Sequence, residues 1–248
     1  MIEAVTISKS FGGHLVLDQV SAKFEKGKTN LIIGQSGSGK TVLMKCLVGL
    51  YELDKGQVLY DGRVFTKMSY EEMKIIRQEI GMLFQGGALF DSMTVEENVV
   101  FPLSMFTKQS AEQKRERANF CLSRVNLVNV NKLLPSELSG GMKKRVAIAR
   151  AIAMKPRYLF CDEPNSGLDP VTANLIDNLI SEITREYEIT TVVNTHDMNS
   201  VLEIGDKISF IHQGKLWWEG SSDTILKSDN KELNDFVFAT KLTRRLKS

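Results

Sequence analysis

The chain has 248 residues, which suits one large domain or a core with an added lobe. Its content of 42% hydrophobic and 25% charged residues is typical of a soluble globular protein. The formal net charge of +2, with no long basic run outside the C-terminal tail, argues against nucleic-acid binding through bulk electrostatics.

Two further classes of protein are poorly supported. The three cysteines, Cys46, Cys121 and Cys161, lie far apart among apolar residues, so they predict buried reduced thiols and neither a metal site nor a disulfide scaffold. No apolar run approaches the length of a membrane span, and the first five residues resemble a strand more than a signal peptide. If the protein serves a membrane, we expect it to do so through a partner.

The N-terminal stretch predicts an antiparallel sheet. Apolar and polar residues alternate from residue 1 to about residue 28, on both sides of a turn at Phe11-Gly12-Gly13. Phe11 lies at this turn, where a lone aromatic residue is more often a packing residue than a ligand contact.

A glycine-rich loop follows an apolar strand at residues 31–33. It fits the pattern G-x-x-x-x-G-K-[ST] at every fixed position, and residues 42–48 predict a helix directly after it. This order predicts a phosphate-binding loop, because backbone N–H groups and the helix dipole face the phosphates. Lys40 would reach the β- and γ-phosphates, and the Thr41 hydroxyl would face Mg²⁺. The loop consists of Gly34, Gln35, Ser36, Gly37, Ser38, Gly39, Lys40 and Thr41.

The next stretch predicts more of the α/β core. Residues 56–62 predict a strand and a turn, and Ser69 with Glu72 has the spacing of a capping box at a helix start. Residues 80–84 predict a buried strand that ends at Gln85.

Residues 88–155 predict a helical lobe inserted into this core. Thr94 with Glu97 forms a second capping box, and a charged helix is expected at about residues 110–125. After Pro135, Ser139 begins a further helix.

The α/β pattern then resumes. Strands are expected at residues 158–161, which end in Asp162-Glu163, and at residues 189–193, which end in Asn194-Thr195-His196-Asp197. Between them lies a helix at residues 170–187, with Asp169 as its cap and proline at its first position. Residues 207–212 and 215–220 predict a hairpin.

Polar residues therefore follow several buried strands at the edge where open α/β sheets bind ligands. Asp162 suits Mg²⁺, and the adjacent Glu163 suits the base that deprotonates a water. His196 suits a γ-phosphate sensor that also helps to hold Glu163 and the water. Taken singly, an acidic pair could cap a helix and a lone histidine is usually structural, but Gln85 and the glycine loop share this edge.

A second anion site is predicted at Leu138-Ser139-Gly140-Gly141-Met142, where a serine and two glycines open a helix. It belongs to the helical lobe, far from Lys40. Such a site makes sense if two chains meet head to tail, so that Ser139, Gly140 and Gly141 of one copy close on the γ-phosphate held by the other.

Together these motifs resemble the nucleotide-binding subunit of ABC transporters, over about residues 1–225. The chain has the Walker A loop, the Q-loop glutamine, the signature Leu138-Ser139-Gly140-Gly141, Walker B, the D-loop Ser166-Gly167-Leu168-Asp169 and the switch histidine, in the family's order. The resemblance implies an α/β P-loop ATPase core at residues 1–228, with an N-terminal antiparallel β subdomain and an inserted helical lobe. It also implies ATP hydrolysis with Mg²⁺.

The resemblance further assigns roles to single residues. Phe11 matches the aromatic residue that stacks on adenine, although the family often has tyrosine there, and Val42 and Asp169 match nucleotide contacts. Catalytic roles fall on Lys40, Gln85, Glu163 and His196, and metal binding falls on Thr41, Gln85 and Asp162. Met142 departs from the more usual glutamine.

Two stretches, Leu83-Phe84-Gln85-Gly86-Gly87-Ala88-Leu89-Phe90 and Pro135-Ser136-Glu137-Leu138-Ser139-Gly140-Gly141-Met142, resemble ATPases of Mla/Mce-type phospholipid transport. This implies a homodimer on the cytoplasmic face of the inner membrane, a permease docked near residues 86–93, an Mce-domain partner complex and, in some systems, a small STAS-domain protein. The alternatives are the ATPase of another ABC system, for solute import or lipoprotein release, and a cell-division ABC ATPase without a transport role.

Residues 229–248 predict a C-terminal helical tail. Leu233, Phe236, Val237 and Leu242 lie at helical spacing and are followed by basic residues, namely Lys241, Arg244, Arg245 and Lys247. This pattern is compatible with a membrane-surface helix. We favour a short helix that packs on the second copy, as the resemblance implies.

Overall fold

The computed structural model describes residues 1–239. Its N-terminal part is an antiparallel sheet in the strand order β2-β1-β4-β5. The predicted alternation around residues 11–13 produces its two long strands, which pair from Ile2 with Phe24 to Phe11 with His14. The sheet comprises β1 (Ile2–Phe11), β2 (His14–Phe24), β4 (Lys55–Tyr60) and β5 (Arg63–Val64).

A second sheet of six strands carries the functional edge, in the order β10-β9-β3-β8-β7-β6. The neighbours β9, β3, β8, β7 and β6 are parallel, and β10 pairs antiparallel with β9. Its members are β3 (Thr29–Ile33), β6 (Ile80–Leu83), β7 (Tyr158–Asp162), β8 (Thr190–Asn194), β9 (Lys207–His212) and β10 (Lys215–Gly220). The carboxyl ends of the parallel strands therefore meet at one edge, as expected for an open α/β sheet.

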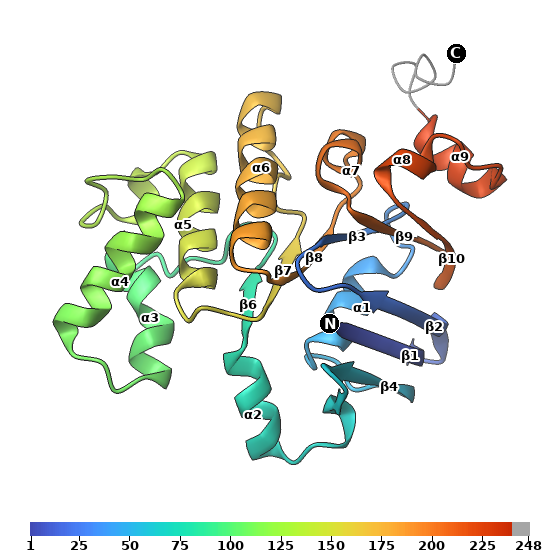
Figure 1. The fold of residues 1–248 in the computed structure, drawn as a ribbon, viewed down its shortest axis with the longest axis horizontal. Coiled ribbons are helices and arrows are strands. Elements are labelled where there is room, and N and C mark those ends of the chain that lie inside the picture. Colours follow the sequence, from blue (N-terminus) through green and yellow to red (C-terminus); the bar gives the residue numbers. More distant parts are fainter. Residues whose placement is uncertain (240–248) are drawn as a thin grey trace.

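Helices cover both faces of this second sheet. Helix α1 (Lys40–Leu47) lies between the two sheets, and α6 (Pro170–Glu186) and α7 (Met198–Ile204) pack on the opposite face (Figure 1). Helix α2 (Tyr70–Gln78) precedes β6. Alternate residues of one strand enter different cores: Ile32 packs with α1, whereas Leu31 and Ile33 pack on the α6 side.

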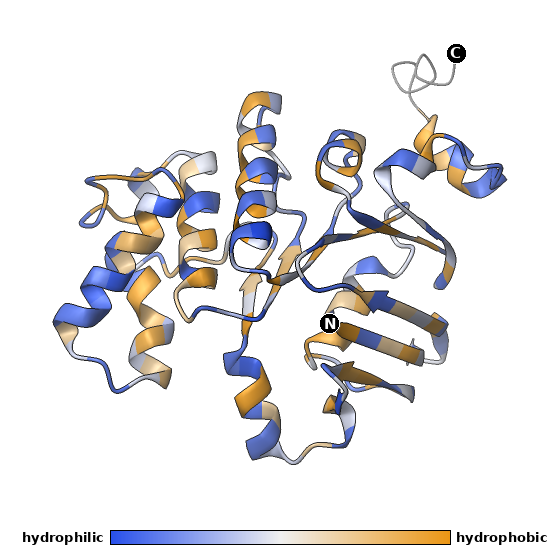
Figure 2. Cartoon of the chain, viewed as in Figure 1, coloured by the Kyte–Doolittle hydropathy of each residue, from blue (hydrophilic) through white to orange (hydrophobic). Residues whose placement is uncertain are grey.

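The helical lobe stands at one end of the molecule, as predicted (Figure 1). It is built from α3 (Val95–Phe106), α4 (Ala111–Arg124) and α5 (Gly140–Ile152), and Figure 2 shows mainly hydrophilic residues on the outer side of α4. Capping boxes at Thr94 and Ser110 start α3 and α4, and a third at Ser69 starts α2. The two boxes predicted from the sequence, at Ser69 and Thr94, are thereby confirmed.

Asn98 on α3 holds the loop that leads into the lobe. Its side chain is fully buried; Oδ1 accepts a hydrogen bond from the Phe90 N–H at 2.8 Å, and Nδ2 donates to the carbonyls of Phe90, Met93 and Thr94. Asn98→Ala should destabilise the protein by about 3 kcal/mol, because it leaves buried backbone groups unpaired. Urea unfolding measures this loss. Asn178→Ala on the exposed face of α6 is the control, and an Asn98→Ala protein as stable as the control would contradict the prediction.

The described part of the C-terminal tail packs on its own chain. After α8 (Ser222–Ile225), helix α9 (Lys231–Val237) buries Leu233 and Val237 in the core, and the Phe236 ring lies 5.5 Å from that of Phe210. β9 thus covers the apolar face of α9 within the chain. The expected contact of the tail with a second copy stays a prediction. Leu242 and the basic residues 241–247 lie outside the described residues.

Within residues 1–239, no helix has both the length and the apolar character needed to cross a bilayer. Cys46, Cys121 and Cys161 are buried free thiols, as predicted.

Candidate nucleotide site

The glycine-rich loop forms one wall of a cavity of about 730 Å³ at the carboxyl edge of the second sheet. Gln85, Glu163 and His196 line the same cavity, so the structure brings together the loop and the polar ends of β6, β7 and β8. From the loop, the lining residues are Gly34, Gln35, Ser36, Gly37, Gly39, Lys40 and Thr41, followed by Val42. Ser38 does not line the cavity, and its N–H donates to the Gln35 carbonyl inside the loop.

Lys40 begins α1 and is folded back over the loop. Its Nζ donates to the carbonyls of Gly34 at 2.8 Å and Gln35 at 2.9 Å. Burial lowers the pKa of its ammonium group, and the negative charges of Glu163 and Asp162 oppose this shift. These two bonds hold the Lys40 ammonium group against the loop, where it is partly shielded from water and can bind the oxygens of a phosphate.

The donor set suits a magnesium ion. Asn194, at the end of β8, donates from Nδ2 to Asp162 Oδ1 at 2.6 Å and to Thr41 Oγ1 at 3.1 Å, so the carboxylate and the hydroxyl lie side by side. Burial raises the pKa of Asp162, an effect that a nearby cation would reverse. Within residues 1–239 no cluster of three or more His, Cys, Asp or Glu side chains could hold a metal alone. A hydroxyl, one carboxylate and phosphate oxygens match the way Mg²⁺ binds with nucleotides.

Glu163 is held by residues from three other elements. Oε2 accepts from Gln85 Nε2 at 2.9 Å, and Oε1 lies 3.0 Å from His196 Nδ1. Its backbone has a φ of +47°, an uncommon conformation for this residue type, and its carbonyl accepts from Lys144 Nζ at 3.3 Å. The carboxylate is therefore fixed at the mouth of the loop, with its two oxygens in contact with the expected glutamine and histidine.

The signature residues lie outside this cavity. Ser139 caps α5, accepting a hydrogen bond from the Met142 N–H, and none of Ser139, Gly140 and Gly141 lines the cavity. A Cβ on Gly141 would come within 2.5 Å of Thr172 Cγ2, so this glycine packs against the start of α6. Within one chain, the signature residues therefore take no part in the cavity that Lys40 lines.

Asp169 and Phe11 also lie away from the cavity lining. The Asp169 carboxylate caps α6, accepting from the N–H groups of Val171 and Thr172, as the sequence predicts. The Phe11 ring packs edge-on against Tyr51, with centroids 5.2 Å apart, and Lys9 Nζ lies over its exposed face. Phe11 as a residue is 42% exposed, so part of it is accessible to a ligand. Its packing against Tyr51 is observed, whereas its contact with adenine stays a prediction.

Several residues of the site were not assigned from the sequence. Asn194 is the clearest case, and its signal was available, because it follows a buried strand just as Asp162 does. Lys144, Val16 and Met198 carry no such signal. Neither do the residues at the end of α9 that line the cavity, which are Asp235, Phe236, Val237 and Ala239.

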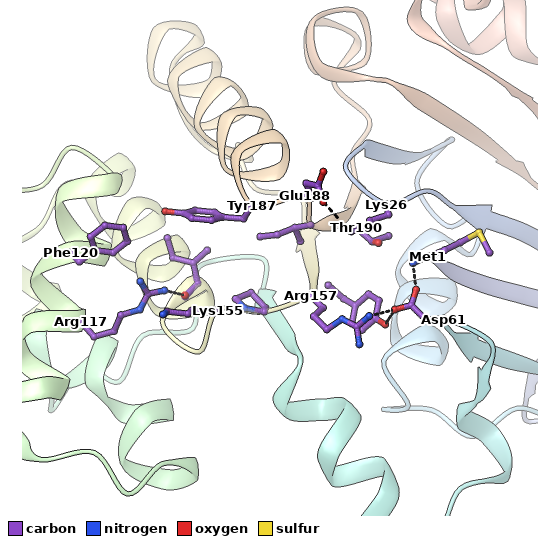
Figure 3. Close-up of a pocket in the computed structure, with 14 residues that line it drawn as sticks. Met1, Lys26, Asp61, Arg117, Phe120, Lys155, Arg157, Tyr187, Glu188 and Thr190 are labelled. Atoms are coloured by element: carbon purple, nitrogen blue, oxygen red, sulfur yellow. Dashed lines mark hydrogen bonds and ion pairs between the residues drawn. The ribbon is translucent and has the colours of Figure 1, made fainter.

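A second large cavity, of about 740 Å³, lies where β7 and β8 begin, at the opposite edge of the sheet (Figure 3). Several of its charged groups are engaged within the chain: Arg157 pairs with Asp61, and Arg117 donates to the carbonyls of Ile152 and Ala153. Lys26 pairs with Glu188 on the same wall. This cavity is remote from the glycine loop and takes no part in the nucleotide site.

The family follows from comparison with known proteins. The profile of the ABC transporter family matches residues 17–166, more than half of the chain. The chain belongs to this family. As an ABC ATPase it binds and hydrolyses ATP, and its fold agrees with that of solved ABC cassettes.

Two relatives of known name align with nearly the whole length of this ABC ATPase. The intermembrane phospholipid transport ATP-binding protein MlaF of Haemophilus influenzae is 35% identical, over 96% of this chain and 90% of the relative. The methionine import ATP-binding protein MetN of the same species is 41% identical, over 90% of this chain but 65% of the relative.

A solved dimeric ATP-binding cassette, in a post-hydrolysis state with ADP and phosphate, superposes with a TM-score of 0.82 at 31% identity. The match covers 90% of this chain and 99% of the cassette. The predicted ABC-ATPase fold is therefore confirmed.

Proposed function

We propose that two copies of this ABC ATPase bind two Mg·ATP molecules head to tail, each between the glycine loop of one copy and Ser139, Gly140 and Gly141 of the other. The observation that carries this proposal is the split site. Glu163, Gln85 and His196 converge on the glycine loop, whereas the second anion-binding helix end lies outside that cavity. The dimeric cassette of the same fold supports the arrangement.

In this site Glu163 is the base that takes a proton from the attacking water. Its carboxylate is held from both sides, so one oxygen can accept the proton while His196 keeps the other in place. Lys40 and the loop N–H groups neutralise charge on the phosphates. Thr41, Gln85 and Asp162 would hold Mg²⁺, which would supply positive charge to neutralise the phosphates. Phe11, Val42 and Asp169 are assigned to nucleotide contacts, Asp169 toward the copy opposite.

A permease is expected to dock at residues 86–93. Phe90 is 41% exposed there, and Arg150 at the end of α5 donates to the carbonyls of Gly87 and Ala88, both at 2.8 Å. Gln85 touches Glu163 and directly precedes this stretch, so a change at the carboxylate would be passed through the backbone at Gln85 to the docking surface.

We propose intermembrane phospholipid transport as the process that this ATPase drives, on the cytoplasmic face of the inner membrane. The 35% identity to MlaF across nearly all of both chains supports this, together with residues 83–90 and 135–142. An Mce-domain complex and a STAS-domain protein are the expected partners. Methionine import is the second candidate, favoured by the 41% identity to MetN.

The two candidates can be separated with the assembled transporter. The ATPase is co-purified with its permease partner and reconstituted in liposomes. We expect ATP turnover to respond several-fold to phospholipid composition and to be unaffected by methionine with a binding protein. Stimulation by methionine alone would contradict phospholipid transport and leave the ATPase assignment intact. The same complex with Glu163→Gln gives the background rate of ATP turnover, since this variant retains all docking surfaces.

A further inference from the structure

A buried carboxylate outside the nucleotide cavity joins two of its functional segments. Asp177 lies in the middle of α6 and is 1% exposed. Its Oδ2 accepts a hydrogen bond from Ser200 Oγ at 2.6 Å and another from Asn165 Nδ2 at 3.2 Å. Asn165 Nδ2 also donates to Ser200 Oγ at 2.8 Å, so the three side chains close a ring of hydrogen bonds.

The ring connects two segments that carry residues of the proposed ATP site. Asn165 lies between Glu163 and Asp169, in the loop that ends at the start of α6. Ser200 lies four residues after His196, in α7, whose N-terminus is capped by Asp197. Asn165 Nδ2 reaches toward Asp197 Oδ2 as well, at 3.5 Å.

We propose that Asp177 is a positioning residue for ATP hydrolysis, which locks the loop at residues 164–169 to the segment that carries His196. A shift of this loop, for example when a second copy presses on it, is then passed to the histidine that holds Glu163. Asp177 touches neither nucleotide nor reacting atoms, and it acts only through Asn165 and Ser200. The proposal rests on the head-to-tail ATP site proposed above.

The strength of this lock depends on the charge of Asp177. A hydrogen bond to an ionised carboxylate is roughly twice as strong as one between neutral groups. Burial raises the pKa of Asp177 to about 6, as do the charges of Asp197 and Glu203 on α7, whereas the bonds from Ser200 and Asn165 oppose the shift. On β7 it faces the Cys161 thiol, whose own pKa is raised by burial. Asp177 Oδ1 has no hydrogen-bond partner among residues 1–239, so it is the atom that takes the proton.

Ionisation of Asp177 should strengthen the hydrogen bonds that support activity, but it should lower the stability of the folded chain. The pKa of Asp177 in the folded chain lies above its ordinary value of 3.8, so the folded state binds more protons between these values. Stability from this group is therefore present below about pH 4 and is lost as the pH rises through about 6. Asp177→Asn, which is neutral and of the same shape, should melt at an equal or higher temperature than the natural protein at neutral pH.

The test compares steady-state ATP turnover of the full chain and of Asp177→Asn from about pH 8 to about pH 5.5. At pH 8 we expect kcat to fall about tenfold in the variant with little change in KM, since the nucleotide contacts stay intact. The kcat of the natural protein divided by that of Asp177→Asn should fall toward one as the pH is lowered, with a midpoint near pH 6. Taking the ratio removes the titration of groups that both proteins share.

Two further variants separate positioning from general destabilisation. Ser200→Ala removes the α7 half of the ring, and combined with Asp177→Asn it should be no slower than the slower single variant. Thr184→Val on the same helix removes a buried hydroxyl that bonds to Ile180 and Thr191, away from the ring, so it should lower stability and leave kcat unchanged.

The following results would contradict the role proposed for Asp177. An Asp177→Asn protein with normal kcat at pH 8, or a rate ratio that is constant with pH, would overturn the inference. The inference would also be overturned if Thr184→Val lost kcat together with melting temperature and the kcat loss in Asp177→Asn were no larger than its own melting temperature accounts for. His196→Ala is run alongside: if it hydrolyses ATP normally, the proposed site itself is wrong, whereas a slow His196→Ala with a normal Asp177→Asn rejects only the role of Asp177.

Discussion

Glu163→Gln should lower ATP turnover by about a thousandfold while leaving ATP binding intact. The amide keeps the shape of the side chain and its contacts with Gln85 and His196, but it cannot accept the proton of the attacking water. With hydrolysis blocked, ATP continues to hold the two copies together, because reopening depends on the loss of its preference for the closed dimer. Phosphate release measures the rate, and gel filtration with Mg·ATP measures the dimer.

The matched control for this variant is Glu188→Gln. That carboxylate pairs with Lys26 at the opposite edge of the sheet and is solvent-exposed, so its neutralisation should change neither rate nor dimerisation. Normal hydrolysis by Glu163→Gln would falsify the assignment of the base and point to another group, with His196 the first to be tested.

Gly34→Ala should abolish nucleotide binding and destabilise the fold by about 3 kcal/mol. A Cβ at this position would lie 2.3 Å from the backbone carbonyl oxygen of Ile211 on β9, and φ is +149°. Backbone of a central strand cannot move aside as a side chain can, so the loop must shift. That shift also moves the Gly34 carbonyl that accepts from Lys40.

Gly37→Ala in the same loop distinguishes lack of space from backbone strain. Its φ is +79°, but nothing lies within 4 Å of the added Cβ. Only the left-handed conformation is then penalised, at about 1 kcal/mol. Urea unfolding and titration with a fluorescent ATP analogue measure both variants. Equal effects at the two glycines would show that the close approach to Ile211 is unimportant.

The elements predicted from the sequence are those encoded by neighbouring residues. Capping boxes at Ser69 and Thr94, the strand at residues 158–161 and the proline-started helix α6 all follow from spacings of a few residues. The site edge was predicted for a related reason: once strands are parallel, residues that follow them must share an edge. Gln85, Glu163 and His196 therefore meet as expected, although they are far apart in the sequence.

What escaped prediction depends on contacts between distant segments. Nothing near Asp177 in the sequence indicates that a serine of helix α7 and an asparagine after β7 will close around it. Similarly, the apolar spacing of residues 233–237 indicates a helix with one buried face but does not say which surface covers it. Phe11 is a third case, because its neighbour Tyr51 comes from beyond the glycine loop and α1.

Helix α5 touches three parts of the proposed machinery. Ser139 at its start would face the nucleotide of the second copy in the proposed dimer, Lys144 bonds to the backbone of Glu163 in its own chain, and Arg150 near its end donates to the loop proposed to receive the permease. Thirteen residues of helix span about 20 Å and resist stretching, because every turn is bridged by hydrogen bonds. If the proposed dimer forms, a shift of Ser139 toward the nucleotide of the opposite copy would be carried along α5 to Lys144 and Arg150 with little loss. The two ATP sites of the pair would then be mechanically coupled through their α5 helices.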